Sequence, residues 1–148
     1  MTGTGAFAIR AFLPADEEAV IALWRECGLV RAWNDPYKDI ARKLSEQPEL
    51  FLVACAGSEE GVVVASAMVG FDGHRGWVYY LAVAPGMQRQ SLGRAMMARA
   101  EQLLIERGCP KLMLMVRSSN AAVIDFYREL GYGEETVVVM GKRLIPDH

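Results

Sequence analysis

The chain has 148 residues, of which 52% are hydrophobic and 23% are charged, and its formal net charge is −2 at neutral pH. This length fits one compact domain spanning residues 1–148, and the apolar content is enough for a core, which disfavours global disorder. The sequence has no block of Lys or Arg. A nucleic-acid partner is therefore disfavoured, and any polyanion must be bound locally rather than by the overall field.

The cysteines and the N-terminal sequence bear on the cellular compartment. Cys27, Cys55 and Cys109 lie far apart and form no C-x-x-C pair. This spacing argues against a disulfide framework or a zinc site and favours a reducing compartment. The first residues contain no basic stretch followed by an apolar one, and the longest apolar run, 62–71, is too short for a bilayer. We therefore expect a cytoplasmic protein without a membrane partner.

The N-terminal third predicts one strand and two helices. Residues 6–14 alternate like a β-strand and stop at a proline. Residues 15–27 place apolar side chains at positions i, i+3, i+4 and i+7, which predicts a helix that Gly28 ends. Residues 31–36 are interpreted as a loop, and residues 37–47 as a short polar helix.

Three strands are expected in the middle of the chain. Residues 49–57 and 61–71 are apolar runs joined by a short turn of Gly, Ser and Glu, which is typical of a hairpin. A second turn, 72–76, leads into a third strand, 77–85, which ends at a proline. The strands therefore follow one another through short connections.

Helices and strands alternate toward the C-terminus. A helix is expected from Leu92 to Arg107, because Gly108 follows it as a stop signal. A strand is expected over 111–117, the segment KLMLMVR, and a second helix over 121–130.

The last two elements have their own boundary signals. Either Asn120 or Ser119 is a suitable cap for the helix 121–130, and Gly131 ends it. The segment TVVVMGKRL, residues 136–144, is expected to be a final strand. The resulting order, β-α-α-β-β-β-α-β-α-β, predicts an α/β (α+β) protein with a mixed, mostly antiparallel sheet flanked by helices.

The segment QRQSLGRAMM, residues 88–97, leads directly into a helix and combines amides, cations and small residues. The first N–H groups of a helix have no intrahelical partner, and the helix dipole favours an anion there. Successive loop amides can add a concave nest, and a glycine allows a close approach. The alternative is a solvated helix cap. The candidate anion contacts are Gln88, Arg89, Gln90, Ser91, Leu92, Gly93 and Arg94.

Two motifs resemble those of the GNAT N-acetyltransferases. The stretch VAPGMQRQSLGRAMM is similar to the family's acetyl-coenzyme A signature, Q/R-x-x-G-x-G/A, with Gln88 and Gly93 matching and Ser91 replacing the first glycine. The stretch VRSSNAAVIDFYRELGY resembles the family's later motif, and its first part is similar to the ribosomal-protein N-terminal alanine acetyltransferases and to small bacterial GNAT proteins. The resemblance implies the GNAT fold, with acetyl-CoA as co-substrate and no metal.

The resemblance also implies roles for individual residues. In the family, the strand before the phosphate loop diverges from the next one, and its main chain pairs with the pantetheine arm. This role falls here on Leu81, Ala82 and Val83, and Asn120 matches the asparagine that contacts the same arm. Tyr127 matches the tyrosine that protonates the departing thiolate. A phenol has a pKa of about 10 and a thiol one of about 8.5, so the donor is protonated at neutral pH.

The sequence leaves several alternatives for the general base. The alanine acetyltransferases carry a glutamate where this chain has Met115, which cannot accept a proton. The remaining alternatives are a relayed water or one of Tyr79, Tyr80, Asp72, His74 and Asp35.

The absence of a carboxylate at this position bears on the acceptor. Deprotonating an α-amine at pH 7 costs about 1.4 kcal/mol, and deprotonating a lysine amine costs about 4.6 kcal/mol. We therefore expect an α-amine or another low-pKa amine, on a small molecule or a peptide. Residues 31–37 and 71–76 are candidates for the acceptor side, with Trp33 either a wall of the site or a surface aromatic.

The sequence thus predicts an acetyl-CoA-dependent N-acetyltransferase in which the amine attacks the thioester directly. The alternative is a non-catalytic coenzyme A sensor, which Met115 and Ser91 favour and Tyr127 opposes. No cysteine lies in a motif that lowers a thiol pKa, so a covalent route is unsupported. The apolar content also permits a homodimer.

Overall fold

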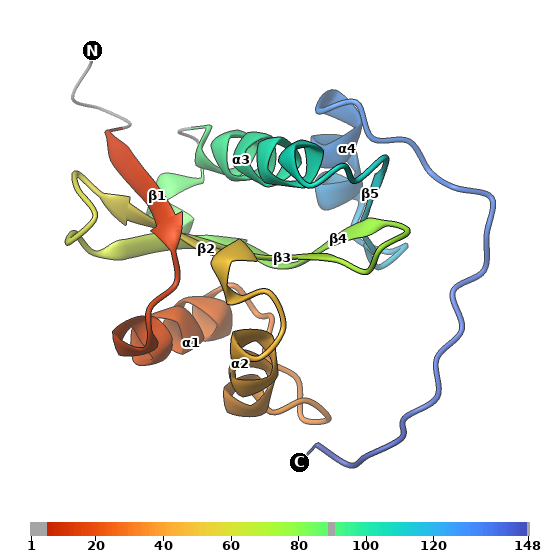
Figure 1. Cartoon of the computed structure of the whole chain (residues 1–148), viewed down its shortest axis with the longest axis horizontal. Coiled ribbons are helices and arrows are strands. Elements are labelled where there is room, and N and C mark those ends of the chain that lie inside the picture. Colours follow the sequence, from red (N-terminus) through yellow and green to blue (C-terminus); the bar gives the residue numbers. More distant parts are fainter. Residues whose placement is uncertain (1–5, 89–90, 148) are drawn as a thin grey trace.

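The computed structural model describes residues 6–88 and 91–147 and contains a five-stranded mixed sheet (Figure 1). The strands lie in chain order, and the first four are antiparallel, whereas the last pairs in parallel with its neighbour. The strands are β1 (Phe7–Ala11), β2 (Phe51–Ala56), β3 (Val63–Phe71), β4 (Gly76–Val83) and β5 (Leu112–Met113).

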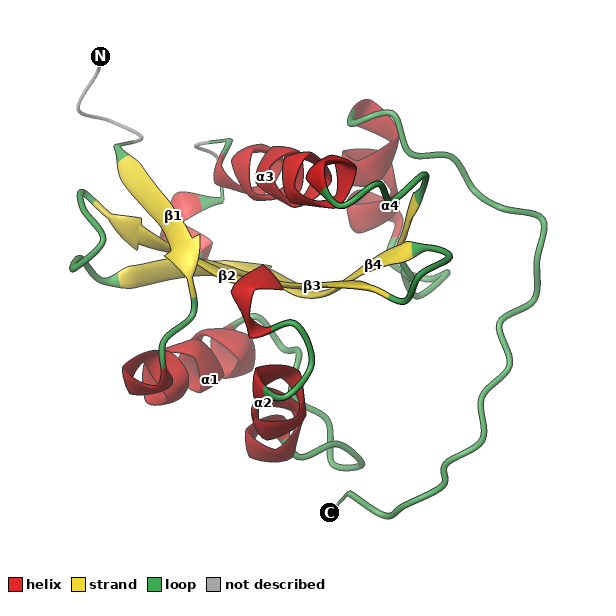
Figure 2. Ribbon diagram, in the orientation of Figure 1, coloured by secondary structure: helices red, strands yellow, loops and turns green. Residues whose placement is uncertain are grey.

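Helices cover both faces of the sheet (Figure 2). Helices α1 (Glu17–Glu26) and α2 (Pro36–Leu44) lie on one face, and α3 (Leu92–Glu106) and α4 (Ala121–Glu129) lie on the other. Each face carries its own hydrophobic cluster, one built on α1 and one on α3. The α/β architecture expected from the sequence, a mixed and mostly antiparallel sheet flanked by helices, is therefore confirmed.

Helix α2 begins earlier and ends earlier than the expected 37–47. Pro36 is its first residue, which suits a proline because its missing N–H needs no partner there. Asp35 caps the helix by accepting the backbone N–H groups of Tyr37 and Lys38. The C-terminal end lies at Leu44, followed by a cap at Ser45.

The expected strand 111–117 is reduced to two paired residues. Only Leu112 and Met113 form β5, opposite Gly76 and Trp77 of β4. Beyond Met113, residues 114–117 leave the ladder, so they have no paired neighbour on the β4 side. The prediction of a full strand was wrong because β-propensity alone does not provide a partner edge.

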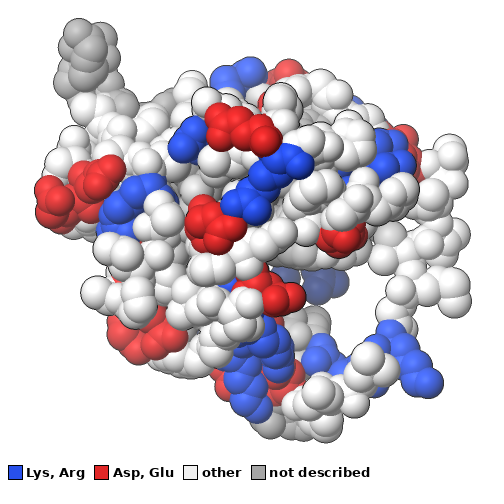
Figure 3. Space-filling model, in the orientation of Figure 1, with Lys and Arg blue, Asp and Glu red and all other residues white. Residues whose placement is uncertain are grey.

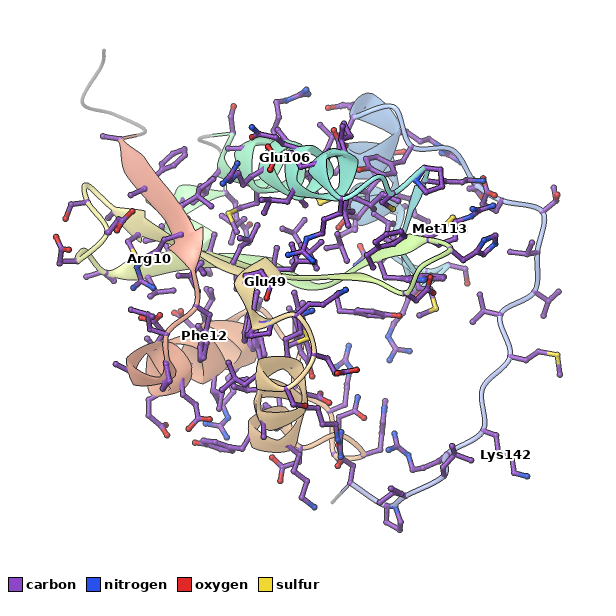
Figure 4. The ribbon with its side chains drawn as sticks, viewed as in Figure 1. Arg10, Phe12, Glu49, Glu106, Met113 and Lys142 are labelled. Atoms are coloured by element: carbon purple, nitrogen blue, oxygen red, sulfur yellow. The ribbon has the colours of Figure 1, made fainter. Side chains whose placement is uncertain are left out.

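The expected final strand 136–144 was also wrong. Residues 133–147 form an extended segment without strand or helix, which arches away from the sheet (Figures 1 and 3). Its valines and methionine, residues 137–140, are 66–89% exposed, and Lys142 points away from the sheet (Figure 4). The segment is held at its ends, by Glu135 on Lys111 and by Asp147 on Arg42. Its middle therefore pairs with no described strand, and apolar β-branched residues do not form a strand without one.

Charged side chains of both signs are interspersed on the face shown in Figure 3. No helix within residues 6–88 and 91–147 is long and apolar enough to cross a bilayer. The same residues contain no group of three or more His, Cys, Asp and Glu side chains arranged to hold a metal ion. Cys27, Cys55 and Cys109 are free thiols.

Strand β1 is tied to the turn before α1 by an ion pair. The two guanidinium nitrogens of Arg10 donate to the two carboxylate oxygens of Asp16 at 2.7 and 2.9 Å, and the Leu13 N–H donates to the same carboxylate. Both side chains are nearly buried, at 15% and 11% exposure. The bond from Arg10 lowers the pKa of Asp16 below its ordinary value.

Replacing Asp16 with Asn is expected to lower the free energy of unfolding at pH 7 by about 2 kcal/mol, because charge-assisted bonds are lost. A depressed folded-state pKa means that this stabilisation is present above about pH 4 and is lost as the pH falls through the folded-state pKa. Urea unfolding at pH 7 and pH 3 should therefore show a difference that shrinks at pH 3.

The matched control is Asp125→Asn, which removes an exposed carboxylate 3.6 Å from Arg128. It should change stability by less than about 0.5 kcal/mol. A difference between wild type and Asp16→Asn that is equally large at both pH values would refute the assigned role.

Candidate active site

The candidate active site is a cleft that opens where β4 and β5 separate. It has a volume of about 790 Å³ and lies between β4, the segment after β5, helix α4 and the loop before α2. Its walls combine aromatic, apolar and charged groups: Leu29, Arg31, Trp33, Asn34, Asp39, Met68, Val78, Tyr79, Tyr80, Leu81, Leu114, Met115, Val116, Arg117, Asn120, Val123 and Tyr127.

A bulge in β4 shapes this cleft. The register with β3 pairs Met68 with Tyr79 and Ser66 with Ala82, so two residues of β4 lie opposite one residue of β3. Tyr80, one of the two, has a φ of 54°. The bulge falls beyond the two residues that pair with β5, so this part of β4 has one edge free of strand partners among the described residues.

Backbone alternation decides which of the expected main-chain groups face the cleft. The Ala84 N–H donates to Val64 of β3 at 2.8 Å, so in an antiparallel ladder the polar groups of Ala82 also face β3. Those of Val83 face the opposite edge, where its carbonyl accepts Gln88 and Cys27, whereas Leu81 lies in the bulge, where strict alternation does not hold. Of the three expected residues, Val83 therefore directs main-chain groups away from β3, and Ala82 does not.

The Val83 carbonyl already has partners in this structure. It accepts the side-chain amide of Gln88 at 3.1 Å and the Cys27 thiol at 3.3 Å. Burial raises the pKa of that thiol. Gln88, an expected anion contact, is therefore engaged with the strand.

Tyr127 lines the cleft from α4. Its side chain is 8% exposed and packs edge-to-face against Phe126 and Tyr132 at centroid distances of 5.0 and 5.8 Å. Its hydroxyl has no hydrogen-bond partner among the residues that the structure describes. Burial raises the pKa of Tyr127 to about 12, so its hydroxyl keeps its proton across the neutral range.

Asn120 lies in the same cleft and caps α4. Its carboxamide oxygen accepts the Val123 N–H at 3.4 Å, which decides between the two cap candidates left open by the sequence. The seven residues from Asn120 to Tyr127 correspond to about two helical turns, so the helix brings both to the cleft.

The expected anion site at the start of α3 is partly described. Arg89 and Gln90 fall outside the described residues. Leu92 is fully buried in the core, so only its backbone is available to a ligand, whereas Ser91 and Arg94 are exposed. The first N–H groups of the helix lack intrahelical partners.

Gly93 has a packing role. A methyl group added there would lie 3.1 Å from Cζ of Phe126, closer than ordinary van der Waals contact. The glycine therefore allows α4 to approach α3, which sets the position of Tyr127 beside the cleft.

Ser91 adopts the left-handed conformation, with φ 61° and ψ 18°. Because this conformation costs a side-chain-bearing residue about 1 kcal/mol, Ser91→Gly should raise the free energy of unfolding by about 0.5 kcal/mol after the entropic cost of glycine. Urea unfolding tests this, with Ser91→Ala as the control that keeps the strain. A loss of stability in Ser91→Gly would contradict the relief of strain.

Comparison with known proteins agrees with this geometry. The sequence model of the Acetyltransferase (GNAT) family matches residues 13–132. The chain belongs to the GNAT acetyltransferase family. An acetyltransferase of Yersinia enterocolitica is 50% identical over 139 residues, covering 94% of this chain and 96% of that protein.

Two solved GNAT structures share the fold. Ard1 from Thermoplasma volcanium superposes with a TM-score of 0.75 at 26% identity, covering 85% of this chain and 82% of that one. The ribosomal-protein-S18-alanine N-acetyltransferase from Escherichia coli superposes with a TM-score of 0.71 at 29% identity, covering 88% and 79%. The resemblance drawn from the sequence motifs is confirmed, and this GNAT protein is an acyltransferase.

The structure separates the base candidates of this GNAT acetyltransferase. Tyr79 and Tyr80 line the cleft, whereas Asp72, His74 and Asp35 do not. The carboxylates of Asp72 and Asp35 accept backbone N–H groups of their own turns, which gives them structural roles. Of the two acceptor segments expected, 31–37 contributes to the cleft and 71–76 does not.

Asp39 is a cleft residue that the sequence interpretation missed. Its carboxylate accepts the Tyr80 hydroxyl at 2.6 Å, across 41 positions of sequence. The available signal was its place on the polar helix 37–47, where it resembled an ordinary solvated charge. It is the only carboxylate lining the cleft among the described residues.

Proposed function

We propose that this protein is an acetyl-CoA-dependent N-acetyltransferase of one domain, residues 1–148, in which an amine attacks the thioester directly. The observation that carries the proposal is the Tyr127 hydroxyl, without a partner among the described residues, in the cleft where β4 and β5 separate. Family membership supports acetyl-CoA as the donor. The free thiols support a cytoplasmic location.

The free edge of β4 fits the pantetheine arm of the donor. The arm carries amide groups, which can pair with main-chain groups of Leu81 and Val83 as an added strand does. Asn120 offers its side-chain nitrogen to the same arm, because only its oxygen is used by the helix cap. The proposed pyrophosphate contacts are the backbone N–H groups between residues 88 and 94, at the positive end of α3.

The chemistry follows from these positions. The amine nitrogen attacks the thioester carbon, and the negative charge that develops on the carbonyl oxygen is stabilised by the backbone N–H of Leu81. As the carbon–sulfur bond breaks, the Tyr127 hydroxyl donates its proton to the sulfur. The raised pKa of about 12 means that this hydroxyl is protonated at neutral pH.

The proposed acceptor is an α-amine or another low-pKa amine, on a small molecule or a peptide. Met115 lies in the cleft at the position of the expected base, but its side chain cannot accept a proton. The smaller cost of deprotonating an α-amine, about 1.4 against about 4.6 kcal/mol for lysine, therefore favours the α-amine. The solved alanine N-acetyltransferase at 29% identity agrees with this class.

The test mixes the protein and acetyl-CoA with two acceptors and follows free thiol. One acceptor is an alanine-leading tripeptide amide, and the other is Nα-acetyl-lysine amide, which presents only the side-chain amine. Faster thiol release with the tripeptide is expected. Efficient release with lysine alone would refute the acceptor class, and coenzyme A binding without thiol release from any amine would refute the enzyme.

A further inference from the structure

Tyr80 is an unusual residue at the centre of the sheet. It occupies the β4 bulge with a φ of 54°, a conformation that an aromatic residue rarely adopts outside a constrained setting. Such strained residues persist only where the surrounding structure holds them, and they concentrate at functional sites.

Two neighbours hold Tyr80 in this conformation. The indole of Trp24 stacks on its ring at a centroid distance of 3.8 Å and an interplanar angle of 11°. The Ser66 hydroxyl donates to the Tyr80 carbonyl at 2.8 Å and itself accepts the Trp24 indole N–H at 2.9 Å. Every polar group in this arrangement lies within hydrogen-bond distance of its partner, so the ring has little freedom to move.

The Tyr80 hydroxyl is directed at a carboxylate. It donates to Asp39 at 2.6 Å, and the other Asp39 oxygen accepts the Arg42 guanidinium at 3.1 Å. Arg42 also binds the buried Asp147 carboxylate at the end of the chain. The hydrogen-bonded network that starts at the hydroxyl therefore contains two carboxylates and one guanidinium, and Arg31 and Arg117 line the same cleft. Asp39 keeps 23% of its side chain exposed, and both it and Tyr80 line the cleft.

We propose that Tyr80 and Asp39 form the proton-accepting pair of the active site and take the proton that the amine nitrogen releases as it attacks. This assignment rests on the proposed function. Tyr80 contacts the amine, and Asp39 acts through Tyr80.

The proton balance of this step is complete. As the carbon–nitrogen bond forms, the nitrogen proton moves to the Tyr80 oxygen while the Tyr80 proton moves to Asp39. The sulfur leaves with the bonding electron pair and receives the Tyr127 proton. Asp39 then returns one proton to solvent through its exposed edge, and Tyr127 regains one from solvent. The products are an amide and a thiol.

Tyr80 serves this role only together with Asp39. Burial and the bond to Asp39 raise the pKa of Tyr80 well above its ordinary value, so the phenol does not ionise to act as a base alone. The carboxylate provides the proton acceptor that the phenol lacks. Tyr132 also donates its hydroxyl to a carboxylate, that of Glu101, but it does not line the cleft, and it therefore serves as the matched control.

The test compares Tyr80→Phe, Asp39→Asn and the double variant with Tyr132→Phe, which should keep the wild-type kcat, using the tripeptide amide and acetyl-CoA. Each single variant should lower kcat about 100-fold, and the double variant no more than either single one, because both residues act on one proton. Calorimetry should show the same acetyl-CoA affinity in all variants. The deficit should also shrink as the pH rises from 7 to 10, since hydroxide replaces the missing base. A merely structural role would leave the deficit constant across this range.

The results of this test separate a failure of the Tyr80–Asp39 pair from a failure of the proposed function. If the wild type releases no thiol with any amine, the proposed function fails, and the pair fails with it. If the wild type turns over and Tyr80→Phe keeps kcat within threefold, only the pair is overturned. If Asp39→Asn lowers the melting temperature, Tyr80→Phe decides alone, because it removes one oxygen and keeps the ring stacked on Trp24.

Discussion

Replacing Tyr127 with Phe is expected to lower kcat about 100-fold or more while the protein remains folded and binds acetyl-CoA. General-acid groups contribute typically about 10²–10⁴ in rate, because they supply a proton where the leaving group needs one. The hydroxyl bonds to no described residue, and the ring packing survives the change, so the free energy of unfolding should shift by less than about 1 kcal/mol. Thiol release under saturating substrates measures kcat, and calorimetry measures acetyl-CoA binding.

The control for this variant is Tyr132→Phe. Tyr132 packs against Tyr127 at 5.8 Å, but its hydroxyl donates to Glu101, and it does not line the cleft. Its loss should leave kcat within twofold. A Tyr127→Phe enzyme with wild-type kcat would show that the departing thiolate needs no proton from this residue.

Replacing Trp24 with Ala is expected to lower the free energy of unfolding by about 4 kcal/mol. Trp24 is fully buried between α1 and the sheet, and its ring stacks on Phe51 and Tyr80. Truncating such a side chain leaves a cavity and, here, removes the donor to Ser66. Urea unfolding measures the loss. We also expect kcat to fall, because Tyr80 loses the ring that holds its strained backbone.

Trp33→Ala is the matched control for this prediction. Trp33 is 50% exposed and lines the cleft, so its removal should change stability by less than about 0.5 kcal/mol. If Trp33 is a wall of the acceptor site, the KM for the amine rises in this variant. A stability loss below about 2 kcal/mol in Trp24→Ala would contradict the role given to that side chain.

Much of the local structure was predictable because the responsible interactions lie within a few residues. The apolar spacing in 15–27 became α1, with Trp24 on its buried face. The predicted helix ends are confirmed as well, because Gly28, Gly108 and Gly131 all have a positive φ just after a helix. The spacing of apolar side chains and the backbone conformations open to glycine are local properties. The linear sequence is therefore enough to predict them.

Part of the candidate site was predictable because a motif named it. Tyr127 and Asn120 were identified by resemblance and lie in one cleft. Asp39 was not identified, because its role depends on a bond to Tyr80 that spans 41 positions. The left-handed Ser91 was unexpected too, because a serine gives no local sign of that conformation.

The sequence by itself determined the class of fold, the position of most helices and strands, and the family whose motifs it carries. The tertiary structure alone decided that β5 stops after Met113, that residues 136–144 form no strand, and that a bulge brings Tyr80 to Asp39. Helices close their hydrogen bonds within a few residues, so their periodicity is sufficient to predict them. A strand and a long-range hydrogen bond each need a partner elsewhere in the chain, and only the folded arrangement supplies it.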